Sequence, residues 1–152
     1  MKAGDIAPNF TIKDQNGKEF ELYKNLDKHL LLVFYPKDDT PVCSSQLEEY
    51  NEDIDEFIKN NINVVGISTD SIQSHLNFCG KLKLKFPLLA DEDKKVSKLF
   101  DAINFLGMTK RLLVLISTDK RILWTDSTLP VTYIKASEIL KKVKLLSLRE
   151  MT

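Results

Sequence analysis

The stretch HLLLVFYPKDDTPVC, residues 29–43, joins an unbroken apolar run to a cysteine through a short polar segment. A run that is apolar on both faces is typical of a central strand with helices on both sides. Pro36 cannot continue that strand, and the polar residues 37–40 separate it from Cys43. The sequence therefore predicts a buried strand whose carboxyl end lies close to a thiol.

Thr40 and Pro41 predict that a helix begins directly before Cys43. Threonine is a favoured N-cap residue, and proline suits the first helical position because its missing N–H would have no partner there. Cys43 is then the third helical residue, beside the free N–H groups and positive dipole end that favour a thiolate. A competing cap, Ser45 with Glu48 three residues later, would start the helix after Cys43. Either start leaves the thiol at the positive end of the helix.

The segments around this stretch alternate between strands and helices. Asn16-Gly17 lies between alternating apolar segments and predicts an N-terminal hairpin. Only residues 118–120 separate the last two predicted strands, so these strands must be antiparallel. The further elements expected are strands at 62–68, 111–117 and 121–127, and helices at 44–61, 71–82, 93–100 and 135–147. This order is that of a thioredoxin-like α/β fold, with an N-terminal β-hairpin extension and a central mixed sheet flanked by helices.

Three of the predicted helices carry apolar residues at helical spacing, which indicates the face that each one buries. The expected buried stripes are Leu47, Tyr50, Ile54, Phe57 and Ile58 in the first, Ile72, Leu76, Cys79 and Leu82 in the second, and Ile139, Leu140, Val143 and Leu146 in the last.

Composition limits the classes of protein to consider. The chain has 152 residues and is 43% hydrophobic, which favours one domain over residues 1–152. Lys+Arg and Asp+Glu both number 22, so the net charge gives no indication of a nucleic-acid or membrane partner. The start MKAGDIAPNF lacks the apolar segment of a signal peptide. Two cysteines do not form a secreted disulfide scaffold, so we expect a cytoplasmic protein whose thiols are reduced or redox-active.

The predicted sheet also suggests a partner for Cys43. An antiparallel strand begins at the edge where its parallel neighbours end, so Arg111 is expected to lie near Cys43. A guanidinium there would stabilise the thiolate and donate hydrogen bonds to an oxygen substrate. An arginine that is merely solvated at the start of a strand is the alternative that position alone leaves open.

The segment FYPKDDTPVC resembles the active-site signature of the peroxiredoxins, Pro-x-x-x-Thr-x-x-Cys, at Pro36, Thr40 and Cys43. HLNFCGKLKLKFPLLAD and RLLVLISTDKRILW are similar to later segments of the bacterioferritin comigratory protein (Q-type) branch. The resemblance extends over residues 3–145.

This resemblance implies a thiol peroxidase that reduces hydrogen peroxide and organic hydroperoxides without a cofactor. Cys43 would be the peroxidatic nucleophile and form a sulfenic acid. Pro36 would shield it, Thr40 would offer its hydroxyl to the peroxide, and Arg111 matches the arginine of the family. The resemblance also implies a thioredoxin-type reductant and a monomer or weak homodimer.

The second thiol has more than one interpretation. Glu48 stands where many Q-type members have their resolving cysteine, and Val42 replaces a usual glycine. Some members resemble this chain in carrying the resolving cysteine on the next helix, where Cys79 lies. Gly80 weakens that helix, which suits a thiol that has to move. If Cys79 is instead a small core residue, the chain is a one-cysteine peroxidase that needs an external thiol.

Other classes of function remain to be compared. A non-enzymatic thioredoxin-fold redox sensor, oxidised at Cys43, is the main alternative to a peroxidase. No metal site is expected, because His29 and His75 have no ligand spacing with each other or with the cysteines.

Overall fold

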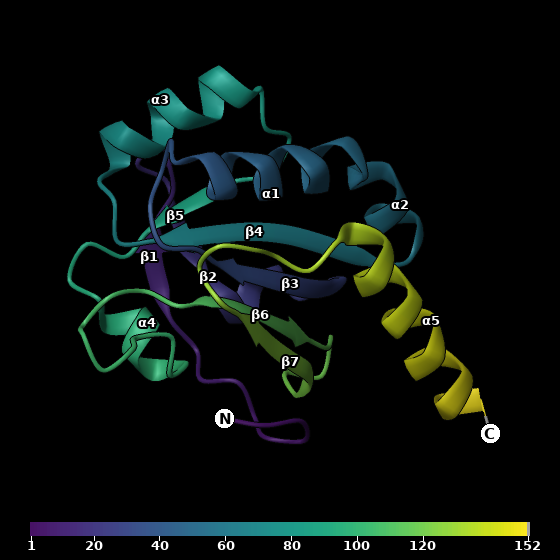
Figure 1. The fold of residues 1–152 in the computed structure, drawn as a ribbon. Helices are drawn as coiled ribbons and strands as arrows, with labels where there is room; N and C mark the ends of the chain where they lie inside the picture. The colour runs from purple at the N-terminus through teal and green to yellow at the C-terminus, as the bar shows by residue number, and fades with distance from the viewer. Residues whose placement is uncertain (152) are drawn as a thin grey trace.

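A five-stranded mixed sheet forms the centre of the protein in the computed structural model, which describes residues 1–151 and the side chains of residues 1–146 (Figure 1). The strand order is β5-β4-β3-β6-β7. Strand β4 runs parallel to β3 and β5, and β6 runs antiparallel to β3 and β7. The strands are β3 (His29–Phe34), β4 (Ile62–Ser68), β5 (Leu88–Ala90), β6 (Arg111–Ile116) and β7 (Ile122–Thr128). The predicted thioredoxin-like arrangement is confirmed, with β5 as a short strand that the sequence analysis missed.

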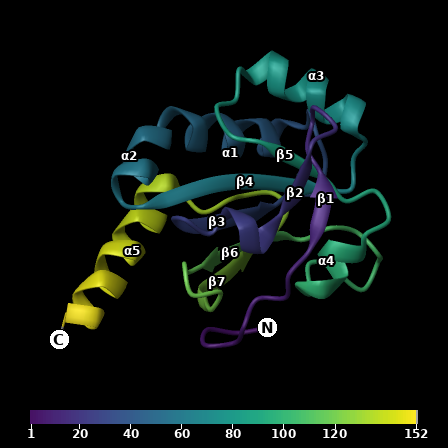
Figure 2. The same ribbon diagram turned by 180° about the vertical axis from the view of Figure 1, so that it is seen from behind.

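Each face of the sheet packs against its own set of elements. One face is covered by α1 (Pro41–Glu52), α2 (Ile54–Lys59), α3 (Ile72–Leu82) and α5 (Ala136–Met151). The other face is covered by the hairpin β1 (Thr11–Lys13) and β2 (Glu19–Glu21), by the short helix η1 (Leu22–Asn25) and by α4 (Lys95–Leu99). Figure 2 shows this second face, with the hairpin in front of the sheet.

Alternate residues of β3 divide the interior into two cores, because successive strand residues point to opposite faces. Leu31 and Val33 belong to the helical-face core, which lies under α1, α2, α3 and α5 and contains Cys43. Leu30 and Leu32 belong to the hairpin-face core, between the sheet, the hairpin and α4.

The hairpin forms as the sequence predicts. Ile12 pairs with Phe20 across β1 and β2. Gly17 has a φ of 74°, a backbone conformation that glycine adopts without steric cost.

The helix predicted over 44–61 is in fact two helices, so that prediction is wrong. The chain leaves helical geometry at Asp53 (φ −97°, ψ 14°), a residue type of low helix propensity. The change of direction keeps Ile54 and Phe57 buried but turns Ile58 outward, where it is 46% exposed. A single buried stripe cannot continue across such a break.

The buried face predicted for the second helix is only partly right, since Cys79 and Leu82 pack against the core but are not its fully buried residues. In α3 the fully buried residues are His75 and Phe78, whereas Leu76 is 44% exposed and Ile72 and Cys79 are partly buried. The helix is rotated toward His75 because polar groups inside the protein bind its ring, as described below. In α5, Ile139 and Val143 are buried as expected, with Leu140 and Leu146 partly buried.

Among the described residues, we find no helix long and apolar enough to cross a lipid bilayer.

Candidate active site

The thiol of Cys43 lies at the start of α1, just beyond the carboxyl end of β3. Helix α1 begins at Pro41, with Thr40 as the N-cap in an extended conformation, so the first of the two predicted helix starts is the one observed. Ser45 lies inside the helix. The first N–H groups of a helix have no intrahelical partner, and here no side chain caps them. Cys43 is only 1% exposed and therefore sits in a nearly dry site at the positive end of α1.

The hydroxyl of Thr40 is not engaged with the helix that it caps. It donates instead to the carbonyl of Lys37, at 2.9 Å, within the loop between β3 and α1. Pro36 opens this loop directly after β3 and is partly buried. The structure therefore places both signature residues in the connection that leads to Cys43.

Arg111 lies beside Cys43, as the sheet topology predicts. It opens β6, which pairs antiparallel with β3, and its side chain is 4% exposed. Its Nη1 donates to Cys43 Sγ at 3.4 Å. Its Nη2 donates to the carbonyl of Pro130 at 2.9 Å, and its buried Nε has no partner within the described part of the chain. The guanidinium is thus held against the sulfur by fixed contacts and excluded from water.

Gln46 is a site residue that the sequence analysis missed. It lies one helical turn after Cys43, is fully buried, and accepts a hydrogen bond from Arg111 Nη1 at 2.8 Å. Its own Nε2 donates to the hydroxyl of Tyr50 at 3.2 Å, and that hydroxyl donates to the carbonyl of Ile134 at 2.6 Å. Burial raises the pKa of Tyr50 well above its usual value, so it remains a donor at neutral pH. The sequence could have indicated Gln46, because it lies three residues after Cys43 and residues at that spacing share a helix face.

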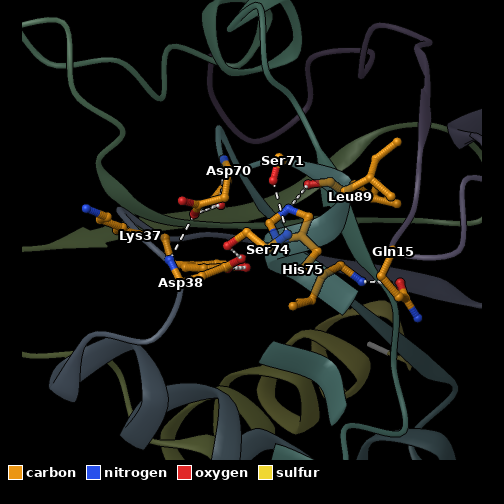
Figure 3. A network of polar contacts seen from close by, with 12 residues as sticks. Gln15, Lys37, Asp38, Asp70, Ser71, Ser74, His75 and Leu89 are labelled. Carbon is orange, nitrogen blue, oxygen red and sulfur yellow. Dashed lines mark hydrogen bonds and ion pairs between the residues drawn. The ribbon is translucent and has the colours of Figure 1, made fainter. Parts of the chain in front are cut away.

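A buried polar network joins Asp38, in the loop between β3 and α1, to His75 of α3 (Figure 3). Asp38 Oδ2 lies 2.7 Å from His75 Nδ1 and accepts from the hydroxyl of Ser74 at 2.8 Å. His75 Nε2 lies 2.8 Å from the carbonyl of Leu89. A carbonyl only accepts, so Nε2 carries a hydrogen, and Nδ1 and Asp38 share another proton. This network explains why α3 turns a histidine toward the interior.

The same network fixes the loop itself. Tyr35 donates to Asp38 Oδ1 at 2.5 Å, and burial, followed by the charge of Asp38, raises the pKa of Tyr35. Asp70 accepts from the backbone N–H of Asp38 at 2.8 Å and from the hydroxyl of Ser68 at 2.5 Å. Ligand atoms of Asp38, Asp70 and His75 lie within 4.8 Å of one another, a grouping that sequence spacing did not predict. Because these atoms already bind one another and their neighbours, the cluster acts as a hydrogen-bond network rather than as a set of free metal ligands.

Cys79 has a different environment from Cys43. Both are free thiols, and Cys79 packs, half-buried, against the helical-face core that contains Cys43. Burial, followed by the charges of Asp38 and Asp14, raises the pKa of Cys79 to about 12. In this conformation Cys79 is a protonated thiol and therefore a poor nucleophile.

Comparison with known proteins gives a consistent result. Residues 3–125 match the family model described as "AhpC/TSA family". The chain is 42% identical over 102 residues to a "Putative peroxiredoxin bcp" of Helicobacter pylori, a match that covers 67% of each protein. It is 38% identical over 129 residues to the "Peroxiredoxin Bcp" of Escherichia coli, covering 80% of this chain and 83% of that relative. The crystal structure of a cysteine-to-serine mutant of PrxQ from Xylella fastidiosa is similar at a TM-score of 0.85 and 32% identity, over 97% of this chain and 98% of that one.

Proposed function

Since the chain belongs to the AhpC/TSA family, in its Q-type peroxiredoxin branch, and is a thiol peroxidase, we propose that Cys43 is the thiol that attacks the hydroperoxide. The observation that carries this proposal is the contact of Arg111 Nη1 with Cys43 Sγ, 3.4 Å, at the start of α1. A guanidinium and a helix N-terminus both favour the thiolate over the thiol.

The reaction follows from this arrangement. The Cys43 thiolate attacks one peroxide oxygen, so that an S–O bond forms as the O–O bond breaks. The leaving oxygen takes a proton and departs as water or an alcohol, and the sulfur is left as a sulfenic acid. Negative charge moves from sulfur to the leaving oxygen, beside the positively charged Arg111. Fixed donors of this kind stabilise developing charge without reorganising.

Thr40 and Pro36 complete the proposed site. The Thr40 hydroxyl now donates to the carbonyl of Lys37. Because a hydroxyl hydrogen can rotate, it can turn from that carbonyl to bind a peroxide oxygen. Pro36 lies near the start of the loop between β3 and α1 and would keep bulk water from Cys43 Sγ.

Cys79 is proposed as the resolving thiol. Its thiolate would attack the sulfenic sulfur, forming the Cys43–Cys79 disulfide as the S–O bond breaks and hydroxide leaves with a proton as water. A thioredoxin-type dithiol would then reduce the disulfide by exchange. Because the pKa of Cys79 is about 12 in the packed helix, resolution requires α3 to open and expose this thiol to water. If Cys79 only fills the core, an external thiol must resolve Cys43 instead.

Two variants test these roles. Cys43→Ser should abolish peroxide consumption with any thiol reductant, and retained turnover would remove Cys43 from the mechanism. Mass spectrometry of peroxide-treated wild-type protein should show a Cys43–Cys79 disulfide. Cys79→Ser should instead accumulate sulfinic Cys43. Stoichiometric oxidation without turnover by any reductant would indicate a redox sensor.

The setting of the enzyme is part of the proposal. We infer that residues 1–152 form one catalytic unit, because a single sheet lies between both cores. Two free thiols that must be reduced again in each cycle suit the reducing cytoplasm. A monomer or weak homodimer is expected from the resemblance to Q-type peroxiredoxins.

A further inference from the structure

The two halves of α3 are held in different ways. Ser71 caps the start of the helix and accepts from the N–H of Ser74 at 3.1 Å. The hydroxyl of Ser74 and the ring of His75 bind Asp38 inside the protein (Figure 3). Phe78 then inserts into the helical-face core, 2% exposed, with its ring centroid 6.4 Å from that of Tyr35. Up to Phe78 the helix is therefore fixed by buried contacts.

From Cys79 onward the helix is held less firmly, because Cys79, Leu82 and Leu84 pack against the helical-face core but are only partly buried. Lys81 pairs with Asp39 at 2.6 Å, but both side chains are more than half exposed, so the pair contributes little. Gly80 leaves open space beside the helix, where an added Cβ would meet nothing within 4 Å. The helix ends at Lys83 with a φ of 53°, a left-handed conformation that is unfavourable for lysine. Phe86, which is 4% exposed, is the next buried anchor.

Asn51 joins this second half to α1. Its Nδ2 donates to the carbonyl of Lys83 at 3.1 Å, and its Oδ1 accepts from the N–H of Lys85 at 2.7 Å. Asn51 belongs to the same helix that begins with the Cys43 turn, so one side chain fastens the Cys79 segment to the Cys43 helix. Both bonds go to backbone groups on either side of Leu84 and hold the turn that follows Leu82, the last residue of α3.

The anchors allow this segment to open alone. Residues 79–85 contain no fully buried side chain, so unwinding them costs the partial burial of Leu82 and Leu84 but leaves the buried rings of Phe78 and Phe86 in place. Helix rises about 1.5 Å per residue and extended chain about 3.3 Å, so unwinding lengthens the reach of each residue. Opening also removes Cys79 from the site that burial and the charge of Asp38 make unfavourable for a thiolate.

We propose that Asn51 is a latch whose two hydrogen bonds to Lys83 and Lys85 control the release of residues 79–85, and so set how fast Cys79 reaches oxidised Cys43. This inference rests on the proposed resolving role of Cys79. Asn51 touches neither the peroxide nor a reacting sulfur and is a positioning residue.

The latch determines how much peroxide the enzyme tolerates. A sulfenic Cys43 that waits for Cys79 is exposed to a second peroxide, which converts it to the sulfinic acid. A tighter latch lengthens the wait and increases this loss, whereas a weaker latch protects the enzyme.

Hydrogen exchange of the reduced protein is the direct test. Asn51→Ala removes both bonds, each of the modest size of an exposed hydrogen bond, and should speed exchange of the amides of residues 79–85 roughly five- to thirty-fold. The amides of residues 75–78 should keep their protection, because buried contacts hold them. Asn60→Ala is the matched control, since within the described residues the side chain of Asn60 binds only the carbonyl of Glu56, in the helix that Asn60 ends, at 2.7 Å. Unchanged exchange of residues 79–85 in Asn51→Ala would overturn the latch.

Rapid quenching after one equivalent of peroxide gives the second readout. Asn51→Ala should form the Cys43–Cys79 disulfide faster by the factor seen in exchange, with the first oxidation unchanged and less sulfinic acid per peroxide. Faster exchange with an unchanged rate of disulfide formation would show that the latch does not limit resolution. If wild-type protein forms no disulfide, the resolving role is wrong, and exchange in Asn51→Ala still decides whether Asn51 holds the segment.

Discussion

The surroundings of Cys43 and Cys79 differ in how firmly they hold a sulfur atom. Cys43 lies against a guanidinium that binds Gln46 and the carbonyl of Pro130, and Gln46 is held in turn by Tyr50. Cys79 lies in a helical turn that is held by partly buried apolar contacts and an exposed ion pair, with open space beside Gly80. In the proposed mechanism, Cys43 has to be reactive before the peroxide arrives, whereas Cys79 has to stay unreactive until Cys43 is oxidised.

The rigid surroundings of Cys43 and the looser surroundings of Cys79 therefore lie on the same face of the sheet. Rigid positioning serves the step in which charge develops on the leaving oxygen, because preorganised donors do not have to move. Loose attachment serves the step that needs a change of shape, since regions that move are drawn from the least stable parts of a fold. The four predictions below test this contrast, beginning with the largest expected effect.

Removing the guanidinium of Arg111 should strongly slow the reaction of Cys43 with peroxide. Arg111→Ala should slow the first oxidation of Cys43 roughly ten- to a thousand-fold, the range for losing a fixed electrostatic donor. Arg111→Lys should restore only part of the rate, because an ammonium lacks the fork that binds Cys43, Gln46 and Pro130 together. Stopped-flow measurement with hydrogen peroxide checks both variants. A lysine variant as fast as wild type would reduce the role of Arg111 to charge alone.

Removing His75 should weaken the region that holds both thiols in place. His75→Ala leaves the buried carboxylate of Asp38 and the carbonyl of Leu89 without their donor. Leaving these buried polar groups without their partner costs about 3 kcal/mol of unfolding free energy. Urea denaturation measures this loss. The matched control is His29→Ala, because in the part of the chain that the structure describes the His29 ring accepts only one exposed N–H, from Thr118 at 3.2 Å. Equal losses in the two variants would contradict the network.

Stiffening the turn beside Cys79 should slow only the second step. Gly80→Ala fits the open space and stabilises the helix by up to about 1 kcal/mol, which corresponds to a roughly fivefold smaller open population. Disulfide formation should slow by that factor, while the first oxidation keeps its rate and sulfinic acid accumulates. Quenched samples analysed by mass spectrometry give all three quantities. An equal slowing of both steps would show that the two thiols are not mechanically separate.

The packed site of Cys79 should also give a small pH-dependent contribution to stability. Its folded pKa of about 12 lies above the ordinary value of 9.0, so folding favours the protonated thiol. This contribution is complete below about pH 9 and is lost as the pH rises toward 12. The difference in unfolding free energy between a Cys43→Ser protein and the same protein with Cys79→Ala should therefore shrink between pH 9 and pH 11. A constant difference would mean that Cys79 is already solvated.

The central sheet and the contact between Cys43 and Arg111 could be predicted from the sequence. Both follow from local sequence patterns and from the direction of the strands. The apolar run 29–35 identified β3, and the three-residue link 118–120 fixed an antiparallel pair. Arg111 then had to open β6 at the edge where β3 ends.

What the sequence did not predict depends on contacts between distant segments. His75 faces inward only because Asp38 and Leu89, from two other segments, bind its ring. No periodicity rule places a histidine inside in preference to Leu76. Likewise, β5 is three residues long and becomes a strand only through pairing with β4. The bonds of Asn51 reach residues more than thirty positions away and leave no local pattern.

The division of the interior into two cores has a consequence for engineering. Cys43 belongs to the helical-face core and Cys79 packs against it, so the shape changes of the proposed catalytic cycle would disturb that side of the sheet. The hairpin-face core, built from residues such as Phe10, Phe34 and Phe100, takes no part in them. Heat tolerance and catalytic rate are therefore adjusted on opposite sides of the sheet. Substitutions that improve packing among these three phenylalanines should raise the melting temperature without slowing resolution.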